Sequence, residues 1–375
     1  MARQSAILGC SMPWSAVFRT PAWIQTLAFW LSLAWLAAQS GPARGQFLGG
    51  RQDLPASLHG QIIDWSDENG ADNRIWSEVL GAPRSLYVYL PPDYDPGTPQ
   101  RVMFWFHAYL QKTGWFAKNL LSEMDSKMAS GELPGMVIVF PDGSQASRRR
   151  KLSLPAATLF MNSEQGEYES HVMDEVWPLV HERFNLSGRK EDHLFAGASM
   201  GGNASMRMAL RHRDRIGAAI SIFGPLDLRY QDICGGFLGN IPRPEPRTNY
   251  NRPRLPVARL AGVVPVRLKQ FAEPLFDLRD PEVAQHIRMQ NPRDLLEDLD
   301  VRPGELKILV AYGRFDDYNF DSQGRAFARA ARERGLEVEE VVDPWGRHSR
   351  RTADRLFPSA LDFIDRYWAE GAENP

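Results

Sequence analysis

The chain has 375 residues, and its 44 basic and 46 acidic residues give a formal net charge of −2. With 43% hydrophobic and 24% charged residues, the composition is typical of a globular protein and excludes a collagen-like or disordered chain. The near-neutral charge offers no attraction for polyphosphate, so we expect no nucleic-acid partner, and two cysteines are too few for a disulfide framework or a four-cysteine zinc site.

An apolar segment lies near the start of the chain. No charged residue occurs between Arg19 and Arg44, residues 23–38 are almost wholly apolar, and small residues follow them. A basic start, an apolar run and small residues form the pattern of a secretory signal peptide. We expect residues 1–45 to be a signal peptide or an uncleaved N-terminal membrane anchor, and the protein to be exported to the periplasm or the cell exterior.

Residues 46–375 are predicted to form a single α/β domain. Short apolar runs between Gly, Pro and Asp predict buried strands at 85–90, 102–106, 136–140, 193–196, 218–223 and 306–312. Helical periodicity predicts helices at 167–184, 203–212, 322–334 and 352–368. Because strands alternate with helices, we expect a mostly parallel central sheet with helices on both faces.

Two regions of this domain depart from the alternation. No helix is predicted between the extended segments 61–65 and 85–90, so we expect them to form an antiparallel N-terminal edge. Residues 229–291 are irregular and rich in Pro and Arg. A segment of that length inside a compact domain is usually a lid or a binding element, and we therefore expect an insertion here.

A G-x-S-x-G motif is the main chemical signal in the chain. Residues 197–202 read GASMGG, follow a predicted strand and begin a predicted helix. In this context the motif forms a nucleophile elbow, a tight turn that needs glycine and presents the serine at the carboxyl end of the sheet. A dinucleotide-binding loop needs glycine where Ser199 stands, and the Gly-Lys pair of a Walker loop is absent. Ser199 is therefore the predicted nucleophile.

A serine nucleophile needs a histidine base and a carboxylate that orients it, here in the chain order Ser, Asp, His. Three histidines follow Ser199. His212 lies in the helix after the motif and His286 lies in the insertion, whereas His348 follows the last predicted strand and directly precedes the final helix. A loop at that point is where the base is required, so His348 is the predicted base.

The carboxylate should follow the strand predicted at 306–312, where Asp316 and Asp317 are adjacent. The usual G-x-x-D spacing after this strand favours Asp316, and Asp317 stays the alternative. Acyl transfer also needs two backbone N–H groups directed at the oxyanion. One should belong to Met200, and the second should come from the loop after 102–106, where Tyr109 is the predicted donor and His107 is predicted to support the loop.

The chain resembles the esterase family of α/β-hydrolases that includes S-formylglutathione hydrolases, feruloyl and acetyl-xylan esterases, enterochelin esterases and the mycolyl-transferring antigen 85 proteins. The resemblance extends from residue 86 to residue 368. It rests on YVYLPPDYDP at 87–96, the loop at His107, FPDG at 140–143, GEYE at 166–169, GASMGG at 197–202, and the segments around Asp316 and His348.

This resemblance implies an α/β-hydrolase fold, with Ser199 as nucleophile, Asp316 and His348 as its partners, and Met200 and Tyr109 as oxyanion donors. The sequence departs from the family at two places. Ala108 stands where many members have glycine, which restricts the backbone there. Residues 349–351 read SRR where many members have an aromatic or acidic residue after the histidine, so the pocket mouth should be more basic.

The predicted reaction is a two-step acyl transfer through an acyl-enzyme on Ser199. It requires no metal or organic cofactor, and the chain has no H-E-x-x-H motif. We expect a serine esterase for a small-molecule or carbohydrate-linked ester. Two alternatives are an acyltransferase of the antigen 85 type, which passes the acyl group to a sugar or lipid hydroxyl, and a non-catalytic binding module on a hydrolase scaffold, against which the complete set of Ser199, Asp316 and His348 argues.

Two features bear on the substrate. The basic run at 148–151 could attract an anionic polysaccharide or a uronate ester, although four adjacent cations in a loop are more often a solvated surface. Tyr109, Trp115 and Trp345 would suit a sugar or aryl ester, although they could equally lie in the core. The predicted export favours carbohydrate-linked or other extracellular esters over the cytosolic thioester branch of the family.

Overall fold

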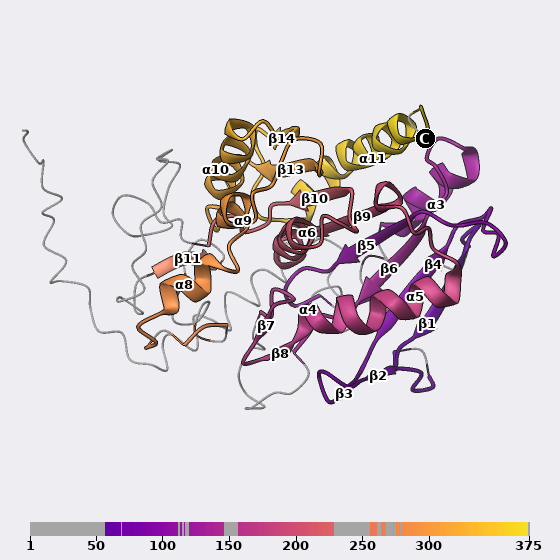
Figure 1. Ribbon diagram of the computed structural model, residues 1–375, viewed down its shortest axis with the longest axis horizontal. Helices are drawn as coiled ribbons and strands as arrows, with labels where there is room; N and C mark the ends of the chain where they lie inside the picture. Colours follow the sequence, from indigo (N-terminus) through magenta and orange to yellow (C-terminus); the bar gives the residue numbers. More distant parts are fainter. Residues whose placement is uncertain are drawn as a thin grey trace, which may run out of the picture.

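The computed structural model describes residues 57–68, 70–111, 113–114, 116, 120–145, 157–228, 256–260, 264–267, 273, 275–277 and 279–373. Within these ranges the main sheet has eight strands in the order β1-β4-β6-β5-β9-β10-β13-β14 (Figure 1). Their bounds are β1 (Gln61–Trp65), β4 (Leu86–Leu90), β5 (Val102–Phe106), β6 (Val137–Pro141), β9 (His193–Ala198), β10 (Ala218–Ile222), β13 (Lys307–Gly313) and β14 (Val338–Asp343).

The main sheet is parallel except at one edge. β1 pairs antiparallel with β4, and β4 pairs antiparallel with β6. All the other neighbours, from β6 and β5 through to β13 and β14, are parallel. The predicted mostly parallel sheet and its antiparallel N-terminal edge are thus confirmed. The carboxyl ends of β5, β9, β13 and β14 lie at the same edge of the sheet, so the loops that follow these strands gather there.

The remaining described elements are helices and three short two-stranded ribbons. The ribbons are β2 (Ile75–Ser77) with β3 (Ala82–Arg84), β7 (Asn162–Ser163) with β8 (Gly166–Glu167), and β11 (Pro256–Leu260) with β12 (Val264–Arg267). The helices are α3 (Leu121–Ser130), α4 (Tyr168–Ser170), η2 (His171–Val176), α5 (Trp177–Phe184), η3 (Lys190–Asp192), α6 (Met200–Arg211), α8 (Val283–Arg288), α9 (Pro292–Asp298), α10 (Phe320–Glu333) and α11 (Arg350–Glu373).

Aromatic contacts of β5 show that helices cover both faces of the sheet. Phe104 stacks on Trp177 of α5 with ring centroids 5.3 Å apart, while its neighbour Trp105 meets Phe357 of α11 edge-on at 6.3 Å. Successive side chains of a strand point to opposite faces, so α5, which crosses in front of the sheet in Figure 1, and α11 cover opposite faces. The structure has the α/β-hydrolase fold expected from the sequence.

Two elements differ from their predictions. The helix expected at 167–184 is divided, because η2 is a π-helix between α4 and α5. β14 is not among the strands delimited from the sequence, since Glu339 and Glu340 interrupt its apolar run. As the last strand of the sheet it has a neighbour on one side only, which leaves its charged side chains partly exposed.

Several predictions concern residues that the structure does not describe. The signal peptide or anchor at 1–45 lies outside the described residues. Of the insertion predicted at 229–291, the structure describes the ribbon β11–β12, residues 273 and 275–277, and the segment from 279 onward, which includes α8. Among the helices that the structure does describe, none combines the length and the apolar character needed to cross a membrane.

Candidate active site

Ser199 lies in the turn between β9 and α6, with φ 54° and ψ −115°. Serine rarely adopts positive φ, and such strain persists only where neighbouring contacts enforce it. Here the Ser199 N–H donates to the Ile222 carbonyl at 2.9 Å. A Cβ on Gly197 would lie 2.4 Å from the Gly201 carbonyl oxygen, and a Cβ on Gly201 would lie 1.9 Å from that of Phe106. Glycine is therefore required on both sides of the serine, and the turn has the strand–turn–helix form of a nucleophile elbow.

His348 bridges Ser199 and Asp316. Its Nε2 lies 3.0 Å from Ser199 Oγ, and its Nδ1 lies 2.8 Å from Asp316 Oδ2. The Asp316 side chain is fully buried and the His348 side chain is 14% exposed. Because an ionised carboxylate only accepts hydrogen bonds, Nδ1 carries the proton and Nε2 accepts from the serine hydroxyl. The structure thus brings together three side chains that are far apart in the sequence.

Asp317 has other partners. Its carboxylate forms an ion pair with Arg347 and accepts a hydrogen bond of 3.3 Å from the His348 backbone N–H. These contacts join the loop after β13 to the loop after β14. Asp316 is the acid that bonds to the His348 ring, whereas Asp317 bonds to the His348 backbone N–H.

Three aromatic rings enclose the His348 imidazole. Phe223, Tyr318 and Phe320 meet it edge-on, with centroid separations of 4.6, 4.8 and 5.4 Å. The backbone N–H groups of Tyr318 and Phe320 donate to Asp316 Oδ1 at 2.9 and 3.3 Å. Burial, helped by nearby carboxylates, raises the pKa of Tyr318 to about 12, so its hydroxyl stays uncharged at neutral pH. The enclosure restrains the imidazole in the orientation that faces Ser199.

The two predicted oxyanion donors follow two neighbouring strands, because Met200 comes directly after Ser199 and Tyr109 belongs to the loop after β5, which pairs with β9. Met200 is the first residue of α6, where backbone N–H groups have no partner within the helix and carry positive potential. In the loop after β5, the Gln111 N–H donates to the Ala108 carbonyl at 3.1 Å, and the Ala108 N–H donates to Gln111 Oε1 at 3.0 Å. Ala108 is not among the residues with positive φ, whereas Leu110 has φ 64°. The turn therefore needs no glycine at 108.

The other histidines considered from the sequence lie elsewhere. His212, at the end of α6, pairs with Glu169 at 3.1 Å, and His286 of α8 pairs with Asp280 at 3.2 Å. Over the part of the chain that the structure describes, no group of three or more His, Cys, Asp or Glu side chains could hold a metal ion.

Two exposed aromatic side chains lie in the loops that carry Asp316 and His348. Phe315 directly precedes Asp316 and is 40% exposed. Trp345, in the loop between β14 and His348, is 79% exposed. Their rings stack with centroids 6.4 Å apart and planes 20° apart. Tyr109 packs against the core. Trp115 and the basic run at 148–151 lie outside the described residues.

Sequence motifs did not reveal the residues that support this arrangement. Phe223 directly follows β10, Tyr318 lies just before α10 and Phe320 is its first residue, and no motif marks these positions. The pairing of Asp317 with Arg347 had a weaker signal, since a cation directly precedes the predicted base and a second carboxylate directly follows the predicted acid.

Comparisons with known proteins identify the family and the fold. A family model described as "Putative esterase" matches residues 77–366. No curated protein sequence matches the chain. A solved ferulic acid esterase superposes with a TM-score of 0.57 at 17% identity, covering 83% of this chain and 99% of its own. The S-formylglutathione hydrolase of Agrobacterium tumefaciens gives 0.56 at 16% identity, covering 84% and 98%.

A fluorophosphonate-binding serine hydrolase of Staphylococcus aureus gives a TM-score of 0.52 at 16% identity, covering 81% of this chain and 98% of its own. At such identities these likenesses show the shared α/β-hydrolase fold. The family model matches well over half of the chain. The protein therefore belongs to this esterase family and is a carboxylic ester hydrolase.

Proposed function

We propose that the protein is a serine esterase in which Ser199 attacks the ester carbonyl. The observation that carries the proposal is the bridge from Ser199 Oγ through the His348 ring to Asp316. His348 Nε2 takes the hydroxyl proton as the Ser199–acyl bond forms, and then gives it to the departing alcohol. Water, deprotonated by the same nitrogen, then attacks the acyl carbonyl, and the proton passes to Ser199 Oγ as the Ser199–acyl bond breaks and the acid leaves. Asp316 orients the ring and stabilises the imidazolium.

The backbone N–H groups of Met200 and Tyr109 are the proposed oxyanion donors. The first follows the nucleophile directly and stands at the N-terminus of α6, whose dipole favours negative charge. The second belongs to the loop after β5, a strand that pairs with β9. Donors held in place before the reaction lower the barrier because they need no reorganisation as charge develops.

The proposed substrates are carbohydrate-linked or aryl esters. The stacked rings of Phe315 and Trp345 support this class, because exposed aromatic faces bind sugar and aryl rings and these two flank the loops of Asp316 and His348. The apolar segment at 23–38 supports export, and such esters occur outside the cytosol.

Labelling with a fluorophosphonate probe tests the mechanism. We expect the wild type to be labelled and Ser199→Ala to remain unlabelled. Ser205→Ala, a substitution on α6, the helix that directly follows Ser199, is the matched control and should label as the wild type does. Equal labelling of Ser199→Ala, or no labelling of the wild type, would overturn the proposal.

Hydrolysis rates on a panel of substrates test the substrate class. The panel contains p-nitrophenyl, feruloyl and acetyl-sugar esters together with S-formylglutathione. We expect the aryl and sugar esters to be hydrolysed fastest. A strong preference for S-formylglutathione would show that the class is wrong and leave the serine mechanism intact.

A further inference from the structure

His107 is a buried histidine, with a side chain 3% exposed, and backbone groups engage both of its ring nitrogens. Nδ1 lies 2.9 Å from the Ala108 carbonyl oxygen, and Nε2 accepts a hydrogen bond of 3.0 Å from the Gly143 N–H. A carbonyl only accepts and an N–H only donates, so these partners place the ring proton on Nδ1. His107 therefore donates to Ala108 and accepts from Gly143.

The Ala108 carbonyl belongs to the same peptide group as the Tyr109 N–H. Its oxygen accepts a second hydrogen bond of 3.1 Å from the Gln111 N–H. In a trans peptide the C=O and N–H bonds point in opposite directions, so donors that hold the carbonyl on one side direct the N–H to the other. Hydrogen bonds to a peptide carbonyl also polarise the group and strengthen its N–H as a donor.

We propose that His107 is a positioning residue for the oxyanion hole, whose Nδ1–H orients and polarises the Ala108–Tyr109 peptide group so that the Tyr109 N–H meets the oxyanion. This inference rests on the proposed function and deepens it. His107 acts through the backbone and does not touch the reacting atoms, which distinguishes it from His348.

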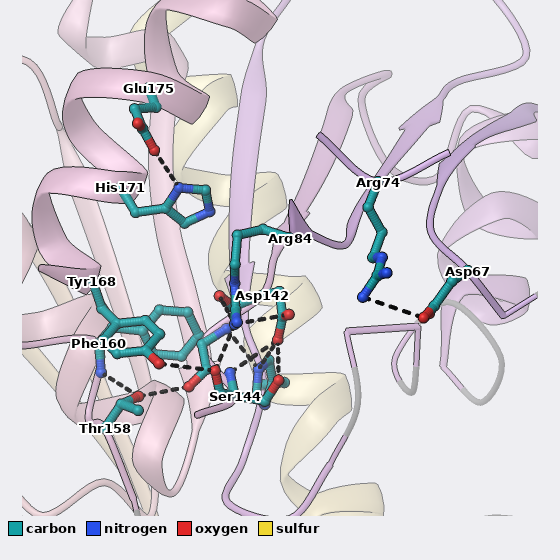
Figure 2. A network of polar contacts seen from close by, with 12 residues as sticks. Asp67, Arg74, Arg84, Asp142, Ser144, Thr158, Phe160, Tyr168, His171 and Glu175 are labelled. Carbon is teal, nitrogen blue, oxygen red and sulfur yellow. Dashed lines mark hydrogen bonds and ion pairs between the residues drawn. The ribbon is translucent and has the colours of Figure 1, made fainter. Parts of the chain in front are cut away.

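The ring is itself held by a buried network. Arg84, 4% exposed, pairs with Asp142 Oδ2 at 2.8 Å and donates to the carbonyls of Asp142 and Ser144. Figure 2 shows Arg84, Asp142 and Ser144 gathered at one point, with Thr158 beside them. The Ser144 N–H and hydroxyl donate to Asp142 Oδ1 at 2.9 and 2.5 Å.

These contacts fix the segment that follows β6. They therefore also fix the Gly143 N–H, which donates a hydrogen bond to His107 Nε2. Thr158 Oγ1 donates to the Gly143 carbonyl at 2.6 Å, and the ring of Phe160 lies edge-on to His107 with centroids 5.3 Å apart. Because its surroundings are fixed on several sides, the imidazole has one orientation in which to meet Ala108.

Two substitutions separate the two hydrogen bonds of the ring. The amide nitrogen of asparagine lies near the position of Nδ1, so His107→Asn can keep the donor to Ala108. The amide of glutamine reaches the position of Nε2, so His107→Gln can keep the acceptor for Gly143 and loses the donor to Ala108. A role in filling space alone predicts the opposite order, because asparagine leaves the larger cavity.

The readouts are kcat and KM for a 4-nitrophenyl ester and for its thiono analogue, in which sulfur replaces the carbonyl oxygen. Removing one oxyanion donor costs about 100-fold or more in kcat, and misaligning one should cost somewhat less. We expect His107→Gln to lower kcat for the ester by about 10- to 100-fold with KM little changed, and His107→Asn to stay within about threefold of the wild type.

The thiono ester distinguishes misalignment of the oxyanion hole from general damage. Sulfur is a weak hydrogen-bond acceptor, so the thiono rate depends little on the Tyr109 N–H. The ratio of ester to thiono rate should therefore fall in His107→Gln and hold in His107→Asn. Equal losses in both variants, or a loss that leaves this ratio unchanged, would overturn the inference.

Gln111 offers a second test that leaves the buried network intact, should the His107 variants not fold. Gln111→Leu removes the acceptor for the Ala108 N–H, and Gln111→Glu keeps it. We expect the rate ratio to fall by a few-fold in Gln111→Leu only, and no difference between the two would count against the inference. Fluorophosphonate labelling of the wild type reports separately on Ser199, so a failure of the proposed function is recognised independently.

Discussion

Two pairs of Asp and His lie at the carboxyl ends of the parallel strands, and their bonding differs. In the first pair His348 Nδ1 donates to Asp316 Oδ2 at 2.8 Å, and Nε2 faces the Ser199 hydroxyl. In the second, Asp142 Oδ1 stays 3.8 Å from His107 Nε2, and that nitrogen accepts the Gly143 N–H instead.

The difference shows that an Asp–His pair does not by itself make a base. His348 keeps one nitrogen for a group that can lose a proton, whereas His107 uses both nitrogens to hold backbone. Asp142 is correspondingly engaged elsewhere. Burial would raise the pKa of this carboxyl, but the Arg84 guanidinium at 2.8 Å and the Ser144 hydroxyl hold it well below its usual range. One pair is arranged to move a proton, and the other to maintain geometry.

The largest expected effect follows from breaking the first pair. Asp316→Asn should lower kcat by about 10⁴-fold with little loss of stability, because an amide no longer fixes the tautomer that His348 needs. Asp317→Asn is the matched control and should lose less than about 10-fold, since Asp317 contacts backbone and Arg347. Steady-state kinetics on a 4-nitrophenyl ester measure both, and a larger loss in Asp317→Asn would reverse their assignment.

Breaking the second pair should act on stability. Asp142→Asn replaces a buried carboxylate by an amide and leaves Arg84 with an unpaired buried charge, which should lower the free energy of unfolding by about 3 kcal/mol. Urea unfolding measures this change. Asp317→Asn again serves as control, and its exposed ion pair should contribute at most about 1 kcal/mol. Equal effects would remove the distinction between the pairs.

The first pair could be predicted from the sequence because its signals are local. The elbow needs glycine at 197 and 201 for steric reasons. Asp316 follows a predicted strand and His348 directly precedes the final predicted helix, so their order along the chain is visible in the sequence. The central strands were recognised for a similar reason, since they are continuous apolar runs. The catalytic roles of these three residues stay predictions until the labelling experiment is made.

The hydrogen bonds of the second pair could not be predicted from the sequence. The bond from Gly143 to His107 joins residues 36 positions apart, and the tautomer of His107 depends on it. Arg84 and Asp142 are separated by 58 positions. Contacts between residues this far apart produce no periodic pattern or fixed spacing in the sequence. The sequence could therefore suggest that His107 supports the loop, but it could not show which hydrogen bonds the ring makes. The same holds for the rings around His348.

A smaller, pH-dependent effect connects stability to the first pair. Burial, followed by the charge of Asp316, raises the pKa of Asp321 to about 6, whereas an unfolded aspartate titrates at about 4. Between about pH 4 and pH 6, Asp321 therefore holds a proton in the folded protein that it has lost in the unfolded chain. This contribution to stability is present below pH 4 and is lost as the pH rises through 6.

Asp321→Asn should remove that dependence. From pH 4 to pH 7 the free energy of unfolding of the wild type should fall by about 2 kcal/mol relative to the variant. Denaturant titrations across this range measure the difference, and in the background of Asp316→Asn it should shrink. A difference that stays constant with pH would show that Asp321 does not hold a proton in the folded protein.

The smallest expected effect concerns the rim beside the first pair. Trp345→Ala should raise KM for a feruloyl ester by about fivefold, equivalent to about 1 kcal/mol of ring stacking, and leave KM for an acetyl ester unchanged. Trp76→Ala is the control, because Trp76 is 59% exposed but belongs to β2, which Figure 1 shows far from β13 and β14. Because the change is made at the rim, kcat should hold for both esters. An equal rise in KM for both esters would mean that Trp345 shapes the loop of His348 and does not contact the substrate ring.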